Sequence, residues 1–369
     1  MLIKDITNFL ETIAPCSLQE DYDNAGLITG NAKDFCSGAL ISLDCTEAIV
    51  QEAIEKNCNL IIAHHPIVFK GLKKLNGSNY VERTIIKAIK NDIAIYAVHT
   101  NLDNVLAGVN GKIAEMLGLQ NVHILSPKKD ILKKLIVFAP KENEEKLSEA
   151  LFAAGAGNIG NYSECSFTTT GIGTFKPGEN TDPFIGSIGV KNIDEEVKIE
   201  VIFPGWLQNN IIKVMKDNHP YEEVAYDIYN LDNYYQEVGS GIIGQLTQPI
   251  NEADFLEQLA AVFKLKIVKH SLLKNLPCKK IAICGGAGSF LINNAKVAGA
   301  DVFITSDVKY HEFFDADAQM LLIDIGHYES EQFTIELLVD LLSNKFPNFA
   351  IQKTGVNTNP VQYFVSKNI

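Results

Sequence analysis

The stretch from Leu60 to Pro66 reads Leu-Ile-Ile-Ala-His-His-Pro, and the fold can be worked out from it. Four consecutive apolar residues predict a strand buried on both faces, as in a parallel sheet covered by helices. Proline cannot donate a hydrogen bond within a sheet, so Pro66 indicates that the strand has ended at the two histidines. Side chains at such strand ends commonly face a cleft, and His64 and His65 are therefore predicted site residues.

Two further segments place polar side chains directly after an apolar run. Val98 to Asp103 reads Val-His-Thr-Asn-Leu-Asp, and Gly326 to Glu331 reads Gly-His-Tyr-Glu-Ser-Glu. In each segment a histidine precedes a carboxylate residue by four positions, a spacing that brings both side chains to one side of a helix. One such pair is common by chance, but three clusters at three strand ends predict a metal site.

Imidazole and carboxylate together suit borderline divalent ions such as zinc, manganese or iron. A single catalytic zinc usually takes three protein ligands, whereas five or six donors with bridging carboxylates fit two ions. Two divalent ions per chain are therefore expected, with zinc first. The alternative is that the histidines are hydrogen-bonded core residues and the last glutamate a first-turn helix carboxylate. The predicted ligands are His64, His65, Asp103, His327 and Glu331, with His99 as a sixth candidate.

Other segments are open to two interpretations. Lys309 and His311 follow an apolar run and are either proton-transfer groups or exposed loop residues. The glycine-rich stretch 284–289 either binds an anion through its amides or is a plain tight turn. The stretch 23–27 either contacts substrate or is a structural turn. His219 is expected to be structural.

Composition excludes several classes of function. The net charge of −13 at pH 7 argues against sequence-independent nucleic-acid binding, which needs a basic surface. Arg83 is the only arginine, so bidentate phosphate clamps are scarce. The seven cysteines include no C-x-x-C pair, as is typical of reduced thiols in a cytoplasmic protein. No apolar run approaches the ~20 residues that span a bilayer, so no membrane association is expected.

Helices and strands alternate at both ends of the chain, with amphipathic helices expected at residues 3–13 and 80–90. This alternation implies βαβ crossovers and a mostly parallel sheet. Between the ends, the pattern strand-helix-strand-strand-helix-strand is the ferredoxin-like split motif. The predicted architecture is an α/β metal-binding domain formed by residues 1–128 and 237–369, interrupted by a ferredoxin-like α+β insert at residues 129–236.

These motifs together resemble the Ngg-interacting-factor-three-like family, whose bacterial members are homologues of the type 2 form of GTP cyclohydrolase I. The resemblance implies a dinuclear metal centre on the five predicted ligands, with His99 as a further ligand or a proton shuttle. His99 and His311 are the predicted catalytic residues. The matching stretches are Tyr22 to Leu27, Ala63 to Pro66, Val98 to Asp103, His219 to Asp227 and Gly326 to Glu331.

The resemblance also implies that the insert is similar to the P-II and CutA-like trimerising domains and that the protein assembles as a hexameric toroid. The expected activity is metal-dependent hydrolysis of a small molecule, with ring opening of GTP and release of formate as one candidate. A second candidate is a phosphoesterase acting on a nucleotide or another small phosphate ester. A third is a regulatory or scaffold protein that has a P-II-like sensing module and structural metals.

Overall fold

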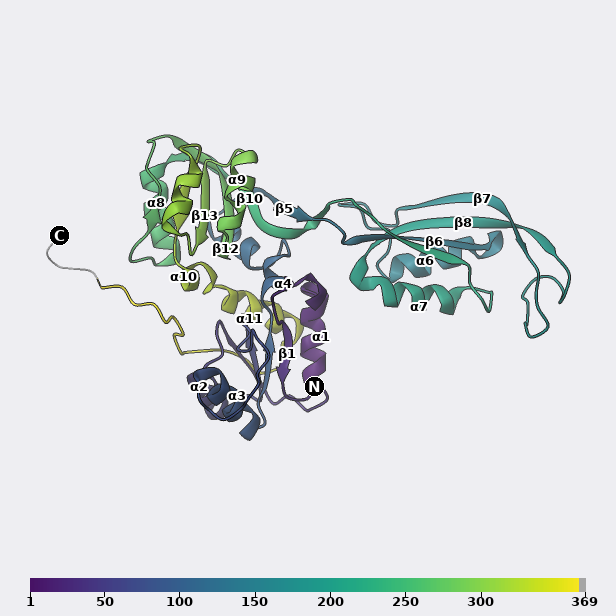
Figure 1. The fold of residues 1–369 in the computed structure, drawn as a ribbon, viewed down its shortest axis with the longest axis horizontal. Helices are drawn as coiled ribbons and strands as arrows, with labels where there is room; N and C mark the ends of the chain where they lie inside the picture. Colours follow the sequence, from purple (N-terminus) through teal and green to yellow (C-terminus); the bar gives the residue numbers. More distant parts are fainter. Residues whose placement is uncertain (365–369) are drawn as a thin grey trace. The chain divides into compact units, whose positions relative to one another are not determined.

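The computed structural model of the protein describes residues 1–364 and has the mixed α/β fold that the sequence predicts (Figure 1). The chain divides into two compact units, Met1–Ser126 with Glu237–Ile369 and Pro127–Gln236. The larger unit contains a five-stranded and a six-stranded sheet, and the smaller unit contains one four-stranded sheet. Each sheet is built from apolar strands on which helices pack.

The five-stranded sheet of the larger unit has the strand order β1-β4-β3-β2-β15. β15, β2, β3 and β4 run parallel, whereas β1 is antiparallel to β4 at the edge. Every side chain of β2, β3 and β4 is buried, which is the pattern of a parallel sheet covered on both faces. The strands are β1 Gly26–Thr29, β2 Ala39–Ser42, β3 Leu60–Ala63, β4 Ala94–Ala97 and β15 Ile351–Lys353.

Helices α2 and α3 pack on this sheet, and side chains cap both of them. Thr46 accepts a hydrogen bond from the Ile49 amide at the start of α2, and Asn79 accepts one from the Glu82 amide at the start of α3. Such caps satisfy N–H groups that the first helical turn leaves unpaired. The helices of this segment are α1 Ile3–Ile13, α2 Glu47–Glu55, α3 Tyr80–Lys90, α4 Thr100–Asp103 and α5 Val109–Met116, with a 3-10 turn η1 at Cys16–Leu18.

The six-stranded sheet has the order β11-β14-β13-β12-β10-β5. β12, β13 and β14 are parallel, but β10 and β11 are antiparallel to their neighbours, so the larger unit is less uniformly parallel than expected. Its strands are β5 Gln120–Lys128, β10 Tyr235–Asn251, β11 Lys269–His270, β12 Pro277–Ala287, β13 Val302–Ser306 and β14 Leu321–Asp324. Its helices are α8 Glu252–Phe263 and α9 Ile292–Val297, with 3-10 turns η4 Ser289–Leu291 and η5 Tyr310–Ala316.

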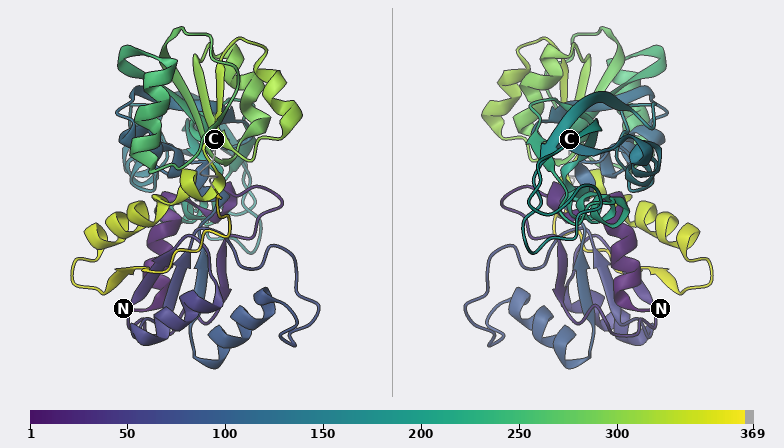
Figure 2. Two further views of the ribbon diagram at one scale, coloured as in Figure 1. Left: turned by 90° about the vertical axis from the view of Figure 1, so that its left-hand side faces the viewer. Right: turned by 90° about the vertical axis from the view of Figure 1, so that its right-hand side faces the viewer.

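The C-terminal helices connect the two sheets of the larger unit. α10, His327–Glu331, packs on β12 and β13 of the six-stranded sheet, whereas α11, Thr334–Lys345, packs on β2 and β15 of the five-stranded sheet. Figure 2 shows these yellow helices between the green strands of one sheet and the blue strands of the other. The carboxyl ends of β3, β4 and β14 therefore come close together, although β14 lies more than 200 residues further along the chain.

The smaller unit is an antiparallel sheet with two helices. Its strands occur in the order β7-β8-β6-β9, and every neighbouring pair is antiparallel. Alternate residues of β6 and β8, such as Leu135, Val137 and Ile199, form its core with side chains from both helices. The elements are β6 Leu132–Pro140, η2 Lys141–Asn143, α6 Glu144–Ala153, β7 Ser166–Phe175, β8 Asn192–Pro204, η3 Gly205–Leu207, α7 Gln208–Asn218 and β9 Tyr226–Asn230.

Helices α1 and α3 have the bounds that the amphipathic patterns predict, residues 3–13 and 80–90. In both helices the apolar residues form a buried face and the polar residues an exposed one, which makes the helical pattern easy to recognise in the sequence. Within residues 1–364, no helix combines the length and the apolar character that crossing a lipid bilayer requires.

Candidate metal centre

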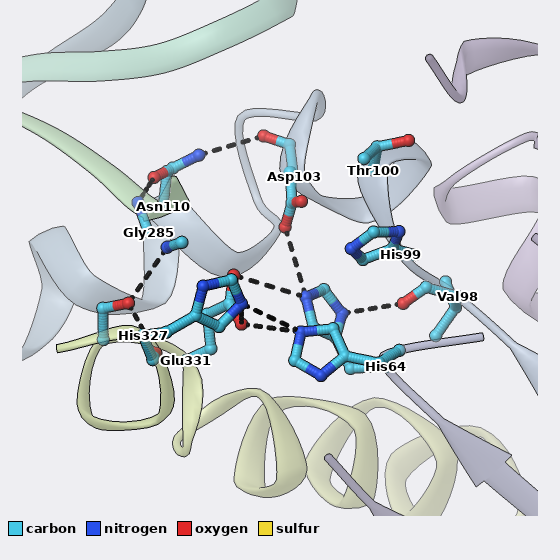
Figure 3. A network of polar contacts seen from close by, with 12 residues as sticks. His64, Val98, His99, Thr100, Asp103, Asn110, Gly285, His327 and Glu331 are labelled. Atoms are coloured by element: carbon cyan, nitrogen blue, oxygen red, sulfur yellow. Dashed lines mark hydrogen bonds and ion pairs between the residues drawn. The ribbon is translucent and has the colours of Figure 1, made fainter. Parts of the chain in front are cut away.

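His64 is completely buried, directly after the end of β3. Its Nδ1–H donates to the carbonyl oxygen of Val98 at 2.8 Å, which fixes the ring and leaves the Nε2 lone pair directed into the cluster (Figure 3). This Nε2 atom is buried and has no hydrogen-bond partner among the described residues. Burial lowers the pKa of His64 to about 4 despite the attraction of Glu331, so the ring is neutral and able to bind a cation.

His65, the next residue, is held from both sides. Its Nδ1 donates to Asp44 Oδ1 at 2.8 Å, and its Nε2 lies 2.9 Å from Glu331 Oε2. Asp44 in turn accepts a hydrogen bond from Thr358 Oγ1 at 2.6 Å. Burial alone would lower the pKa of His65, but the hydrogen bonds to Asp44 and Glu331 outweigh it and raise the pKa to about 10.

His327 and Glu331 lie one turn apart on α10, so both side chains project to the same side. His327 Nδ1 donates to Asp307 Oδ2 at 2.6 Å, and His327 Nε2 lies 3.1 Å from Glu331 Oε2 and 3.3 Å from His65 Nε2. Burial opposes the charge on His327, yet the hydrogen bonds to Glu331 and Asp307 raise its pKa to about 9. Two imidazoles and one carboxylate thus converge on a single point.

Asp103 approaches His64 from α4. Its Oδ1 lies 3.6 Å from His64 Nε2, and Glu331 Oε1 lies 3.8 Å from the same nitrogen. Asp103 Oδ1 is buried without a hydrogen-bond partner among the described residues. Burial and the negative charge of Glu331 raise the pKa of Asp103 well above its usual range, so this carboxylate needs a nearby cation to ionise.

The glutamate at the centre stays ionised. Burial opposes its charge, but hydrogen bonds from His327 and His65 hold the pKa of Glu331 well below its usual range. Its two oxygens face different partners, Oε1 toward His64 and Oε2 toward His65 and His327. Such a carboxylate has the geometry of a bridging ligand.

The donor atoms therefore fit a divalent cation. Three overlapping groups each bring their ligand atoms within 4.8 Å of one another. Two of the groups contain Glu331. One of these two also contains His64 Nε2 and Asp103 Oδ1, the buried atoms that have no hydrogen-bond partner among the described residues. Nitrogen and oxygen donors in these proportions suit zinc, manganese or iron. The groups are His64 with Asp103 and Glu331, His65 with His327 and Glu331, and His64 with His65 and His99.

His99 lies beside this cluster, with its ring centroid 5.2 Å from that of His64 and 5.3 Å from that of His65. Its Nδ1 donates to Asp23 Oδ1 at 2.8 Å, and Thr100 donates to the other oxygen of Asp23. Burial would raise the pKa of Asp23, but the hydrogen bonds from His99 and Thr100 lower it to about 2. The structure thus gives the stretch 23–27 a role in orienting His99.

Three carboxylates hold the imidazoles of the site, and sequence reasoning did not assign this role to any of them. Asp44, Asp23 and Asp307 each accept a hydrogen bond from the Nδ1 of one histidine. Such partners fix the tautomer and orientation of a metal-binding imidazole. Asp44 and Asp307 follow strands β2 and β13 closely, which is the signal that also identified the histidines. A lone carboxylate has no spaced partner to mark it, so the sequence pattern identifies neither residue.

Two of the other histidines lie away from the cluster. His311 is exposed on η5, where its ring stacks on Phe314 with the centroids 6.4 Å apart, and it does not line the cleft over the cluster. His219 has both ring nitrogens occupied within the smaller unit: Nε2 bonds to the Phe138 carbonyl, and Nδ1 accepts from the Tyr221 amide. His219 is therefore structural, as expected.

The glycine-rich stretch 284–289 has its amides occupied by protein groups. The amide of Gly285 donates to Asn110 Oδ1, that of Gly286 to Ser330 Oγ and that of Gly288 to Thr305 Oγ1, all at 2.8 to 2.9 Å. These three amides are not free to bind an anion. The stretch is not a plain tight turn either, because residues up to Ala287 belong to the end of β12, where its pairing with β13 shifts register between Ile283 and Ala287 and where α10 packs on it. Gly286 has a positive φ of 65° and lies so close to Glu331 that a methyl group would collide with it.

A cleft of about 1060 Å³ opens over the cluster. Residues from both sheets of the larger unit line it, including His65 and His99 from one and His327 from the other. The C-terminal segment also contributes, through Thr358 to Val361 and Tyr363. A small molecule can therefore reach the cluster from solvent.

Comparison with known proteins places this arrangement in a family. The sequence matches the family described as Duf34/NIF3 (NGG1p interacting factor 3) over residues 1–360. The chain belongs to the Duf34/NIF3 family. This confirms the resemblance that the histidine and carboxylate motifs suggest.

Relatives of this Duf34/NIF3 chain include proteins named GTP cyclohydrolase 1 type 2 homolog. One from Halalkalibacterium halodurans is 38% identical over 97% of this chain and 98% of its own length. One from Bacillus subtilis is 37% identical over 98% of each chain. Among solved structures, a Bacillus cereus protein described as related to NIF3 has 38% identity and a TM-score of 0.86 over 99% of both chains.

Proposed function

We propose that this Duf34/NIF3 protein is a metal-dependent hydrolase that acts on a small molecule and binds two divalent cations. The observation that carries the proposal is the position of Glu331, whose two oxygens face separate groups of nitrogen donors. Asp103 supports it, because its buried Oδ1 has no hydrogen-bond partner among the described residues and its carboxylate would ionise there only beside a cation. The cleft over the cluster gives a substrate access to it.

One cation would be held by His64, Asp103 and Glu331, and the other by His65, His327 and Glu331. Zinc is the first candidate, and manganese or iron also suit these donors. When bound, the pair supplies Lewis acidity, which lowers the pKa of water and polarises the bond to be hydrolysed.

The remaining residues have positioning and proton-transfer roles in this proposal. Asp44 and Asp307 hold the Nδ1–H of His65 and His327, which would leave the Nε2 atoms of both rings to bind the cations. His99, oriented by Asp23, is the group best placed to carry a proton to or from the substrate. His311 has no part in it, because it lies outside the cleft.

Ring opening of GTP with release of formate is the reaction to test first, because the relatives are named as homologues of GTP cyclohydrolase 1 type 2. This reaction requires that zinc-loaded protein release formate from GTP and that His65→Ala release none. His123→Ala is the matched control, since His123 is exposed and bonds only to the backbone of Asn121 among the described contacts. Equal formate from the parent and His65→Ala would reject this reaction.

A phosphoesterase is the second candidate, and the shared Glu331 favours it. Two cations joined by one carboxylate can stabilise both the attacking and the leaving oxygen of a displacement at phosphorus. Release of inorganic phosphate from para-nitrophenyl phosphate by the zinc-loaded protein, absent in His65→Ala, would support it. Formate release without phosphate release would favour the cyclohydrolase reaction instead.

We also propose that the smaller unit is a ferredoxin-like, P-II or CutA-like module and that the protein forms a hexamer, with the cytoplasm as its predicted compartment. The order of its elements and the strand order β7-β8-β6-β9 support the first part. Light scattering tests the second part: six chains of 40.6 kDa give about 244 kDa. The mass of a monomer or dimer would reject the hexamer.

A further inference from the structure

The charges around the cleft disfavour a phosphorylated substrate. Four aspartates and three glutamates line it, against a single lysine among the described lining residues. Even two divalent cations, with four positive charges, leave this lining negative while the imidazoles are neutral. A triphosphate brings about four further negative charges into the same space and would be repelled.

The basic side chains and backbone amides that could bind phosphate here are paired with other groups of the protein. Arg83 does not line the cleft and pairs with Glu47 at 2.9 Å. The lining lysine, Lys269, forms an ion pair with Asp324 at 2.5 Å. In the glycine-rich stretch the amides of Gly285, Gly286 and Gly288 donate to Asn110, Ser330 and Thr305, so these three amides offer no backbone cradle for an anion.

Aromatic side chains line part of the cleft. Phe69 and His99 form a T-shaped pair with the ring centroids 5.6 Å apart, so an aromatic ring lies next to the metal cluster. Phe69, Tyr80 and Phe290 are also well exposed, and exposed rings around a cleft are available to stack on a planar ligand. The aromatic side chains that line the cleft are Tyr22, Phe69, Tyr80, Phe290, Tyr328 and Tyr363.

We propose, on the basis of the hydrolase function above, that the substrate is a planar nitrogen heterocycle without phosphate groups, either neutral or cationic. The aromatic side chains would stack on its ring. The acceptor-rich lining, with exposed carboxylates such as Asp307, would accept hydrogen bonds from its ring and amino N–H groups. The cleft of about 1060 Å³ has ample room for a nucleobase or a nucleoside.

Binding of matched pairs of nucleoside and triphosphate tests this inference without any turnover. Zinc-loaded, desalted protein would be titrated with guanosine and GTP, adenosine and ATP, and cytidine and CTP in a calorimeter. At least one nucleoside is expected to bind with a Kd below about 1 mM and about tenfold more tightly than its triphosphate. Elemental analysis after each titration shows whether the triphosphate has instead removed zinc from the protein.

Phe69→Leu is expected to weaken nucleoside binding about tenfold, since stacking on an aromatic side chain contributes on the order of 1–3 kcal/mol per base. Phe314→Leu is the matched control, because Phe314 is also exposed but does not line the cleft. The inference is overturned if no nucleoside binds, if triphosphates bind as tightly as nucleosides, or if Phe69→Leu binds like the parent protein.

The hydrolase function and the ligand class would be rejected by different results. A protein that binds nucleosides through Phe69 but hydrolyses no compound in its zinc-loaded form keeps the ligand class and loses the hydrolase role. A protein that releases formate from GTP, and binds GTP more tightly than guanosine, keeps the hydrolase role and loses the ligand class.

Discussion

His65 Nε2 lies 2.9 Å from Glu331 Oε2, although the two residues are 266 positions apart in the chain. β3 carries one of them to the end of the five-stranded sheet, and α10, which packs on the six-stranded sheet, carries the other. The junction of two sheets thus creates a group of donors that neither sheet contains alone.

Replacement of the central glutamate is expected to remove bound metal. Glu331→Gln keeps the size of the side chain but removes the charge that both donor groups share, so most of the zinc should be lost on desalting. The measurement is zinc per chain by elemental analysis. Glu329→Gln is the control on the same helix, because Glu329 belongs to none of the donor groups. Equal zinc in the two variants would show that Glu331 is not a ligand.

Metal binding is expected to release protons. Hydrogen bonds raise the pKa of His65 to about 10 and that of His327 to about 9 without a cation, so both rings are charged at neutral pH. A cation must displace these protons, and its affinity should therefore rise as the pH rises toward 9. Calorimetry at pH 7.5 in buffers of different ionisation enthalpy should report release of about two protons or more per chain. Zinc binding that releases no protons would contradict this arrangement of charges.

Gly286 is expected to be indispensable to the site. An alanine methyl group there would collide with Glu331, whose position is held by its contacts with His65 and His327. Gly286→Ala should therefore lower both zinc content and Tm. Gly299 also has a positive φ, but it has open space around it. Gly299→Ala should therefore lower the free energy of unfolding only by the backbone cost of roughly 1 kcal/mol. Identical zinc content and Tm in the two variants would mean that the close approach of Gly286 to Glu331 has no consequence.

Asp44 is expected to act through His65 rather than as a ligand. Asp44→Asn removes the charge beside Nδ1 and should weaken zinc binding by about 10–100-fold. It should also reduce the number of protons released, because the pKa of His65 would fall. Asp315→Asn, an exposed residue outside the cleft, should change neither quantity. Weaker zinc binding with unchanged proton release would point to a general loss of structure instead.

The sequence predicts regular elements well where local signals agree. α3 has the expected bounds because its apolar stripe and its Asn79 cap indicate the same start. The sequence does not predict β10, because Gly239, Gly241 and Gly244 interrupt its apolar pattern and its pairing with β12 depends on contacts distant in sequence.

The same limit applies to the site. A histidine next to a strand end or a carboxylate four positions away is visible in the sequence, and those residues do converge. His311 shares the strand-end signal with His99, but it lies on η5 and is not among the residues that line the cleft. The roles of Asp44, Asp23 and Asp307 become apparent only when their distances to the imidazoles are known.

Anomalous diffraction from crystals of the zinc-loaded protein tests the central claim most directly. The account predicts two peaks per chain about 3.5–4 Å apart. Glu331 should lie between them, with His64 and Asp103 beside one peak and His65 and His327 beside the other. Crystals at full zinc content that show no peak at these residues, or one peak that Glu331 does not touch, would contradict it.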